Sequence, residues 1–180
     1  MGATISSWMP VAGPPLSAVD DFDLGKYAGK WYQVAFLPNW FQQKGATNVT
    51  ATYTALSDGS IRVENESFSP CGKRSYIEGI ASKDPECSRG GARFMVQFTP
   101  NVTQPLVGPP APYWVIQLAD DYRYAVVSEP SRQYLWILSR QPSIASDDLV
   151  HITERLVEQG FDKSTLDKLV WTRHSDAGAA

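Results

Sequence analysis

Hydrophobic and polar residues alternate along most of this chain with a period of two, which is typical of strands buried on one face. The clearest stretch is VTATYTA, where Val49, Ala51, Tyr53 and Ala55 share one face and threonines occupy the other. We interpret seven further stretches as strands, although the phase of the third stays open: KWYQVAFL, IRVENES, RSYIEGIAS, RFMVQF, YWVIQL, YRYAVVS and YLWILSR. Short connections join most of them, which predicts an antiparallel meander.

The number of strands favours a closed sheet. A meander of eight strands leaves two exposed edges unless its ends pair, and closure into a barrel removes both. The interior of an eight-stranded barrel holds either packed side chains or one small ligand. We therefore expect an all-β fold, an eight-stranded antiparallel up-and-down barrel.

After the eighth strand the period changes to that of a helix. The stretch SDDLVHITERLVEQG has an apolar stripe formed by Leu149, Ile152 and Leu156. Ser146 is expected at its N-cap, and Gly160 as the residue that ends it. This one C-terminal α-helix is expected to flank the barrel from outside. The later stretch LDKLVWT is a candidate ninth strand.

Length and composition predict one domain. The chain has 180 residues, of which 43% are hydrophobic, enough for one compact core. We expect residues 20–173 to form the barrel and its helix, with flexible segments at 1–19 and 174–180. Its net charge of −3 argues against binding nucleic acid through phosphates. The N-terminal stretch shows no secretory signal pattern, so we expect a location in the cytoplasm or peripheral at a membrane, with organellar and secreted locations left open.

The reactive side chains give no recognised catalytic or metal-binding pattern. An extended segment of ten residues spans about 33 Å, whereas disulfide Cα atoms lie within about 7 Å, so Cys71 and Cys87 are expected to be free thiols. The two histidines, His151 and His174, belong to no Ser-His-Asp, HExxH or CxxC arrangement. We expect no catalytic residue, no metal and no cofactor.

Two short motifs resemble those of the lipocalins. Gly29-Lys30-Trp31 is similar to the G-x-W motif of their first strand, and the stretch LSRQP supplies Arg140 at the end of the eighth. The resemblance implies that Arg140 packs across Trp31 by a cation–π contact, binds backbone carbonyls, and seals the closed end of the barrel. Gly29 lets the chain turn beneath it.

Longer stretches resemble one lipocalin group in particular. TATYTALSDGSIRVENES and PSRQYLWILSR are similar to the temperature-induced lipocalins of plants and algae, and also to bacterial outer-membrane lipocalins and apolipoprotein D. The similarity covers roughly residues 20–172. No lipobox cysteine occurs near the N-terminus, which is a departure from the bacterial branch.

Strand parity, counted from Arg140, indicates which side chains face the interior. Trp136 and Leu138 share its face, and the resemblance implies that both line the pocket. The full predicted ligand-binding set is Gln33, Tyr53, Val63, Asn65, Phe94, Val96, Tyr113, Val115, Trp136 and Leu138. The alternative is that these side chains fill the barrel as core. By parity Glu64 and Glu66 point outward, while the phase of Glu78 stays open.

Two loops are expected at the open mouth of the barrel. PNVTQPLVGPPAPYW is rich in proline and carries the apolar pair Leu106 and Val107; temperature-induced lipocalins have a similar loop, linked in that group to membranes. FLPNWFQQKG adds Trp40 and Phe41. These side chains are candidates for contact with a bilayer interface, where Trp is favoured. The alternative is a lid over the mouth.

These observations predict a binding protein. We expect the barrel to carry or sequester a small hydrophobic ligand, such as a fatty acid, lysophospholipid or sterol, and the resemblance implies a role in membrane-associated stress protection. A carrier of a bilin, retinoid or carotenoid pigment, an enzyme acting on a lipophilic substrate, and a scaffold barrel with a filled interior stay as alternatives. Ligand identity and oligomeric state are left open.

Overall fold

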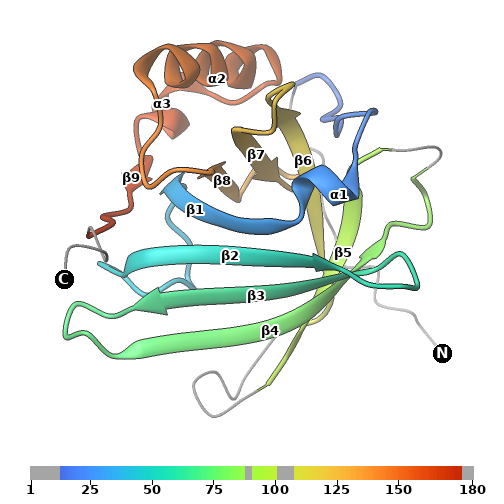
Figure 1. Ribbon diagram of the computed structural model, residues 1–180. Coiled ribbons are helices and arrows are strands. Elements are labelled where there is room, and N and C mark those ends of the chain that lie inside the picture. The colour runs from blue at the N-terminus through green and yellow to red at the C-terminus, as the bar shows by residue number, and fades with distance from the viewer. Residues whose placement is uncertain (1–12, 88–90, 101–107, 176–180) are drawn as a thin grey trace, which may run out of the picture.

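Eight strands close into a barrel in the computed structural model, which describes residues 13–87, 91–100 and 108–175 (Figure 1). Each strand pairs antiparallel with the next, and β1 pairs with both β2 and β8, so the ring has no free edge. The predicted eight-stranded barrel is therefore confirmed. Its strands are β1 (Gly29–Phe36), β2 (Thr47–Ala55), β3 (Ile61–Phe68), β4 (Arg74–Lys83), β5 (Arg93–Thr99), β6 (Ala111–Leu118), β7 (Tyr124–Ser128) and β8 (Leu135–Ser139).

The remaining elements lie around this ring. Helix α1 (Leu24–Tyr27) is a single turn before β1, and Asp23 caps it by accepting from the backbone N–H groups of Gly25 and Lys26. Helix α2 (Ser146–Glu158) lies outside the wall near β6 and β7 (Figure 1). Helix α3 (Lys163–Leu166) leads to the short β9 (Val170–Trp171), which pairs with Ala35 and Phe36 of β1 outside the ring.

The start of α2 differs by one residue from the sequence prediction. Ala145, not Ser146, is the N-cap residue, and Ser146 is the first residue of the helix, which has no side-chain cap. Two carboxylates in the first turn, Asp147 and Asp148, supply the negative charge that the positive helix end favours. At the other end, Gly160 follows the last helical turn, as predicted. Its φ of +87° is a left-handed conformation that glycine adopts readily.

Two separate apolar clusters hold the fold together. The outer cluster lies between α2 and the barrel wall, where Ile152 and Leu156 are fully buried against side chains such as Val126 and Ile137. The inner cluster fills the barrel side of the same wall and includes Trp31, with side chains from most strands. The barrel wall is thus apolar on both faces under α2.

The structure extends the packed region beyond the predicted boundaries. In the N-terminal segment expected to be flexible, Leu16 is buried in the outer cluster, and Val19 is hydrogen-bonded through its backbone to Ala92 and Val115. In the expected C-terminal tail, a ring nitrogen of His174 lies 2.8 Å from the backbone oxygen of Gln33. Residues 1–12 and 176–180 lie outside the described residues.

Both cysteines are free thiols, as the sequence predicts. Cys71 is exposed in the turn between β3 and β4, and Cys87 follows β4 at the other end of that strand. No helix in the described part of the chain has the length and apolar character needed to cross a membrane.

Candidate functional site

The inner face of the barrel is lined mainly by apolar and aromatic side chains, which come from all eight of its strands. Alternation within each strand sends every second side chain to this face. Eight of the ten predicted lining residues belong to the inner cluster or pack against it: Tyr53, Val63, Phe94, Val96, Tyr113, Val115, Trp136 and Leu138. The structure therefore brings these eight together on one surface.

The two polar residues of the predicted set behave differently. Gln33 is buried, but its side-chain amide donates a 3.0 Å hydrogen bond to the Thr172 hydroxyl in the segment after β9. This segment lies beside β1 where β2 diverges from it, and Arg173 forms a parallel bridge with Thr47. Asn65 is half-buried and lies opposite Ala51, a member of the inner cluster.

Strand β4, whose phase the sequence left open, places Gly79 and Ala81 on the inner face. Gly79 lies between Val63 of β3 and Phe98 of β5, and Ala81 lies opposite Ile61. A Cβ atom at Gly79 would come within 2.6 Å of the Gln97 carbonyl oxygen. Glycine is therefore required here, because Phe98 and the neighbouring backbone occupy the space of a side chain.

Arg140 and Trp31 close one end of the barrel. The guanidinium carbon of Arg140 lies 3.9 Å from the centroid of a Trp31 ring. Its nitrogens donate hydrogen bonds of 2.7–3.2 Å to four backbone carbonyls, those of Lys26, Tyr27, Ala28 and Lys30. Burial lowers the pKa of Arg140. Both terminal nitrogens of the guanidinium are thus engaged with backbone carbonyls.

Gly29 makes this closure possible. Its φ is +99°, which residues with a side chain rarely adopt. A Cβ atom at this position would lie 3.3 Å from a terminal nitrogen of Arg140. The backbone beneath the Arg140–Trp31 pair therefore needs glycine for both its conformation and its space.

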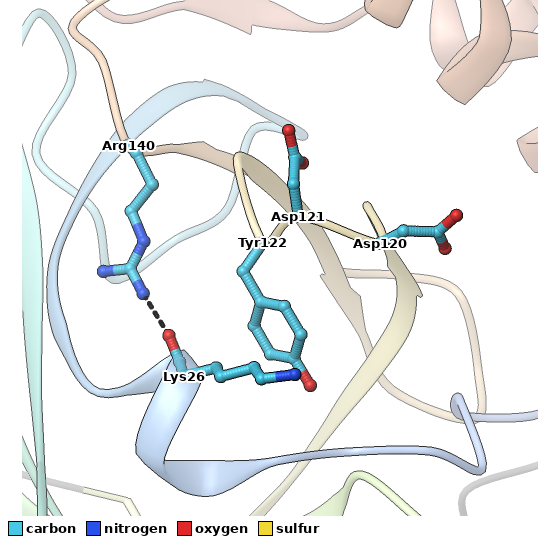
Figure 2. Close-up of a pocket in the computed structure, with 5 residues that line it drawn as sticks. All are labelled: Lys26, Asp120, Asp121, Tyr122 and Arg140. Atoms are coloured by element: carbon cyan, nitrogen blue, oxygen red, sulfur yellow. Dashed lines mark hydrogen bonds between the residues drawn. The ribbon is translucent and has the colours of Figure 1, made fainter.

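A pocket of about 430 Å³ lies beside Arg140 at this closed end (Figure 2). It is lined by Lys26, Asp120, Asp121, Tyr122 and Arg140, so four of its five lining side chains carry charge. Figure 2 shows the Arg140 guanidinium directed at the backbone oxygen of Lys26. An apolar ligand gains little from such a lining, so this pocket is not the site that the inner cluster defines.

Three tyrosines form a hydrogen-bonded chain within the inner cluster. The Tyr113 hydroxyl lies 2.7 Å from the Tyr27 hydroxyl and 2.7 Å from the Tyr53 hydroxyl. Burial raises the pKa of Tyr53 to about 12 and raises those of Tyr27 and Tyr113 well above the usual value. All three are therefore neutral phenols across the physiological pH range.

An aromatic group lies on the same inner face toward the other end of the barrel. Phe41, from the loop between β1 and β2, packs against Tyr134 and Trp136, which stack on each other with ring centroids 6.0 Å apart. Trp40 contacts Phe41 edge-on but is 82% exposed. The other two candidates for bilayer contact, Leu106 and Val107, lie outside the described residues.

The acidic side chains of the β3–β4 hairpin meet one another outside the apolar interior. The single O–H of Tyr76 is shared between two carboxylates, and its oxygen lies 2.8 Å from Glu64 and 3.2 Å from Glu78. Val63 belongs to the inner cluster, and Glu64 and Glu66 lie one and three positions after it in β3. Their carboxylates therefore face outward, as predicted. Across residues 13–87, 91–100 and 108–175, no group of three or more His, Cys, Asp or Glu side chains is arranged to hold a metal.

Several residues of the inner face were absent from the predicted set, among them Ile61, Val127 and Tyr27. Tyr27 is the one of these three that strand alternation could not have found. It lies in α1, outside any strand, so strand parity gives it no face. The cap at Asp23 starts the helical turn that carries Tyr27 beneath the barrel, where it is fully buried against Trp31 and Tyr53. The Trp31 indole donates a 2.8 Å hydrogen bond to the Tyr27 carbonyl, which holds the helical turn against the first strand.

The fold and the inner face together define a class of protein, the closed up-and-down β-barrels whose interior is lined by apolar side chains. Residues 22–172 match the family described as the lipocalin-like domain. The chain belongs to this family. Binding of small hydrophobic ligands is the function that the family supports, and its members are generally binding proteins rather than enzymes.

Three relatives extend this assignment over most of the chain. Temperature-induced lipocalin-1 of Arabidopsis thaliana is 38% identical over 85% of this chain and 81% of its own length. The outer membrane lipoprotein Blc of Escherichia coli (strain K12) is 35% identical, covering 89% and 85%. Apolipoprotein D of Mus musculus is 32% identical, covering 83% and 76%. The predicted resemblance to all three groups is confirmed.

Solved structures confirm the fold. Insecticyanin from the tobacco hornworm Manduca sexta superposes with a TM-score of 0.69 at 20% sequence identity. The match covers 94% of this chain and 89% of insecticyanin. At this identity the likeness concerns the course of the backbone alone.

Proposed function

We propose that this protein binds one small hydrophobic molecule inside the barrel and carries or sequesters it away from water. The observation that carries the proposal is the continuous apolar inner face, formed by residues such as Val63, Phe94, Val115 and Leu138. Apolar surface removed from water contributes roughly 25 cal/mol per Å². A ligand that buries about 300 Å² therefore gains several kcal/mol before entropy losses, consistent with micromolar binding.

The predicted lining residues divide into two roles within this proposal. Apolar side chains in the middle of the wall, such as Val63 and Val96, exclude water from the ligand. Trp136 lies where the wall meets Phe41 of the β1–β2 loop, and its side chain is only half-buried. It is the large aromatic surface that a ligand entering past this loop contacts first.

We also propose that the mouth of the barrel contacts a membrane, from which the ligand enters. Trp40 projects from the β1–β2 loop while Phe41 beside it packs against the inner aromatic group. Phe41 is itself 50% exposed, so the loop presents two aromatic side chains at the surface, and one of them also contacts Trp136 of the inner face. The Arabidopsis relative is named temperature-induced lipocalin-1. We propose that this chain likewise acts under temperature stress, where the barrel would hold lipids released from damaged membranes.

The test is to purify the protein natively, extract it with organic solvent, and analyse the extract by mass spectrometry beside an absorption spectrum of the protein. A lipid present in stoichiometric amount is the expected result. A chromophore in the extract would assign the protein to the pigment carriers instead. An empty extract, together with no saturable binding of a fluorescent fatty-acid probe, would contradict ligand binding.

A further inference from the structure

Two exposed lysines lie at the rim of the barrel mouth. The loop between β1 and β2 carries Lys44 as its one charged residue, and the turn between β3 and β4 carries Lys73 as its one. These two segments lie against each other, since a Cβ atom at Gly45 would be 3.2 Å from Pro70. Within the described part of the chain, neither ammonium group has an ion-pair partner. The rim therefore presents two unpaired cations to solvent.

The acidic groups at the same end do not offset these cations. Glu66 of β3 is ion-paired with Arg74 at the start of β4. Glu129, in the loop between β7 and β8, is 1% exposed, and its carboxylate accepts hydrogen bonds from three backbone N–H groups of that loop. The sequence between β5 and β6, residues 100–110, contains no charged side chain, and residues 162–168 around α3 carry two acidic and two basic ones. The mouth is therefore positively charged.

The opposite end of the barrel, its base, carries the opposite charge on its turns. The turn between β2 and β3 has Asp58 as its one charged residue, and the turn between β6 and β7 has Asp120 and Asp121. Arg123, the basic residue of this second turn, is ion-paired with Asp121 and Asp148. The charge of the barrel thus changes sign along its axis, although the net charge of the chain is −3.

The two ends are far enough apart that a surface at the mouth responds to the mouth alone. The nine residues of β2 span about 30 Å from the mouth to the base, whereas screening at physiological salt acts over about 8 Å. An anionic surface therefore attracts the lysines while the acidic base is screened from it. This attraction turns Trp40, which is 82% exposed on the same loop as Lys44, toward the surface.

We propose that the mouth docks on a bilayer that contains anionic phospholipids, with Lys44 and Lys73 at the headgroups and Trp40 in the interface. This inference rests on the proposed membrane contact and names the lipid class that the contact requires. Each lysine near an anionic bilayer contributes about fivefold in affinity, and Trp is favoured at the interface. A soluble polyanion offers no apolar layer for the indole, so a bilayer is the partner that matches both features.

Co-sedimentation compares vesicles of phosphatidylcholine alone with vesicles that also contain phosphatidylglycerol. Wild-type protein should bind the mixed vesicles at least about tenfold more tightly, and a rise from about 0.1 to about 1 M salt should remove this preference. The double variant Lys44→Gln/Lys73→Gln should bind the mixed vesicles about tenfold more weakly than wild type. The matched control, Lys30→Gln/Lys83→Gln, removes two exposed charges at the base and should stay within about twofold of wild type.

A second readout reports the orientation of the protein and leaves both lysines in place. Cys71 is an exposed free thiol in the same turn as Lys73, so a polarity-sensitive fluorophore attached to it in a Cys87→Ser background lies at the mouth. Its emission should move to shorter wavelength when mixed vesicles are added. The same fluorophore attached through Asp58→Cys, in a background of Cys71→Ser and Cys87→Ser, lies at the base and should not respond.

The outcomes separate this inference from the proposed function. Equal binding of wild type to both kinds of vesicle, or unchanged binding of Lys44→Gln/Lys73→Gln to mixed vesicles, would overturn the inference while membrane contact stands. A fluorophore that responds at position 58 but not at Cys71 would overturn docking through the mouth. If wild type binds neither kind of vesicle, the proposed membrane contact fails as well, and saturable binding of a fluorescent fatty-acid probe then shows that ligand binding inside the barrel stands.

Discussion

The guanidinium carbon of Arg140 lies over a Trp31 ring, 3.9 Å from its centroid, and the guanidinium binds the backbone of the segment that leads from α1 into β1. One side chain at the end of β8 therefore joins the last strand of the ring to the start of the first. Arg140 donates to four carbonyls at once, so this position needs the planar guanidinium group with its several N–H donors, and a positive charge alone is not enough.

Arg140→Lys should therefore destabilise the protein although it preserves the charge. We expect a loss of roughly 1–3 kcal/mol in the free energy of unfolding, because an ammonium group cannot reach all four carbonyls while stacking on Trp31. Urea unfolding followed by circular dichroism measures it. Arg62→Lys is the control, since Arg62 is exposed and makes a 3.5 Å ion pair with Glu78; it should change stability by at most about 0.5 kcal/mol. Equal effects of the two substitutions would contradict the role of Arg140.

The three buried tyrosines predict a decline of stability at alkaline pH. The pKa of Tyr53 is about 12 in the folded protein, against about 10 in an unfolded chain. Below pH about 10 the phenol is neutral in both states and its contribution is complete. Between about 10 and 12 the unfolded state releases protons first, so the contribution is lost as pH rises.

An absorbance titration of phenolate formation measures this directly. Tyr53 should ionise near pH 12, and Tyr27 and Tyr113, whose pKa values burial also raises, should ionise well after an exposed tyrosine, which does so near pH 10. Tyr53→Phe should remove one late-titrating group. If all tyrosines titrated together near pH 10 in folded protein, the buried hydrogen-bonded chain would be disproved.

The docking of α2 on the barrel predicts a large difference between two residues of that helix. Ile152 is fully buried in the outer cluster, whereas Val150 is 58% exposed. Ile152→Ala should lower the free energy of unfolding by about 2–4 kcal/mol through lost burial and a cavity. Val150→Ala, another truncation of a β-branched residue on the same helix, should stay within about 0.5 kcal/mol. Thermal or urea unfolding measures both changes in the free energy of unfolding. Similar losses for the two variants would contradict the docking of α2 through Ile152.

Membrane contact at the mouth predicts that Trp40 partitions into bilayers. Co-sedimentation with phosphatidylcholine–phosphatidylglycerol vesicles should show binding of wild-type protein and at least about fivefold weaker binding of Trp40→Ser, because the exposed indole loses its apolar burial. Val150→Ser on the outside of the wall is the control. Binding that is equally strong in Trp40→Ser and wild type would exclude this loop as the contact.

The barrel was predictable because most strands alternate cleanly. In β5, Phe94 and Val96 face inward in sequence and structure alike. The phase of strand β4 could not be predicted for a physical reason. Its inner face carries Gly79, because Phe98 occupies the space of a side chain there, and its outward-facing Ile80 is apolar although it is 39% exposed. Side-chain hydrophobicity therefore does not report the phase of that strand.

The floor of the candidate site was less predictable, because it is built from outside the alternating pattern. Tyr27 reaches the inner face from a single helical turn, and only the assembled barrel brings its hydroxyl to Tyr113, which lies 86 residues away in the chain. Gln33 was expected to face a ligand, but the structure engages its amide with Thr172 at the far end of the sequence. Contacts of such separation depend on the closed ring and leave no local signal.

Titration of delipidated protein with a fluorescent fatty-acid probe tests the central claim most directly. Saturable binding near one probe per chain is expected. Trp136→Ala should weaken it about tenfold, because this inner side chain offers a large apolar surface. Trp171→Ala is the matched control, since Trp171 lies in β9 outside the ring and is 51% exposed; its affinity should equal that of wild type. Absence of saturable binding to wild-type protein would contradict a ligand-binding interior.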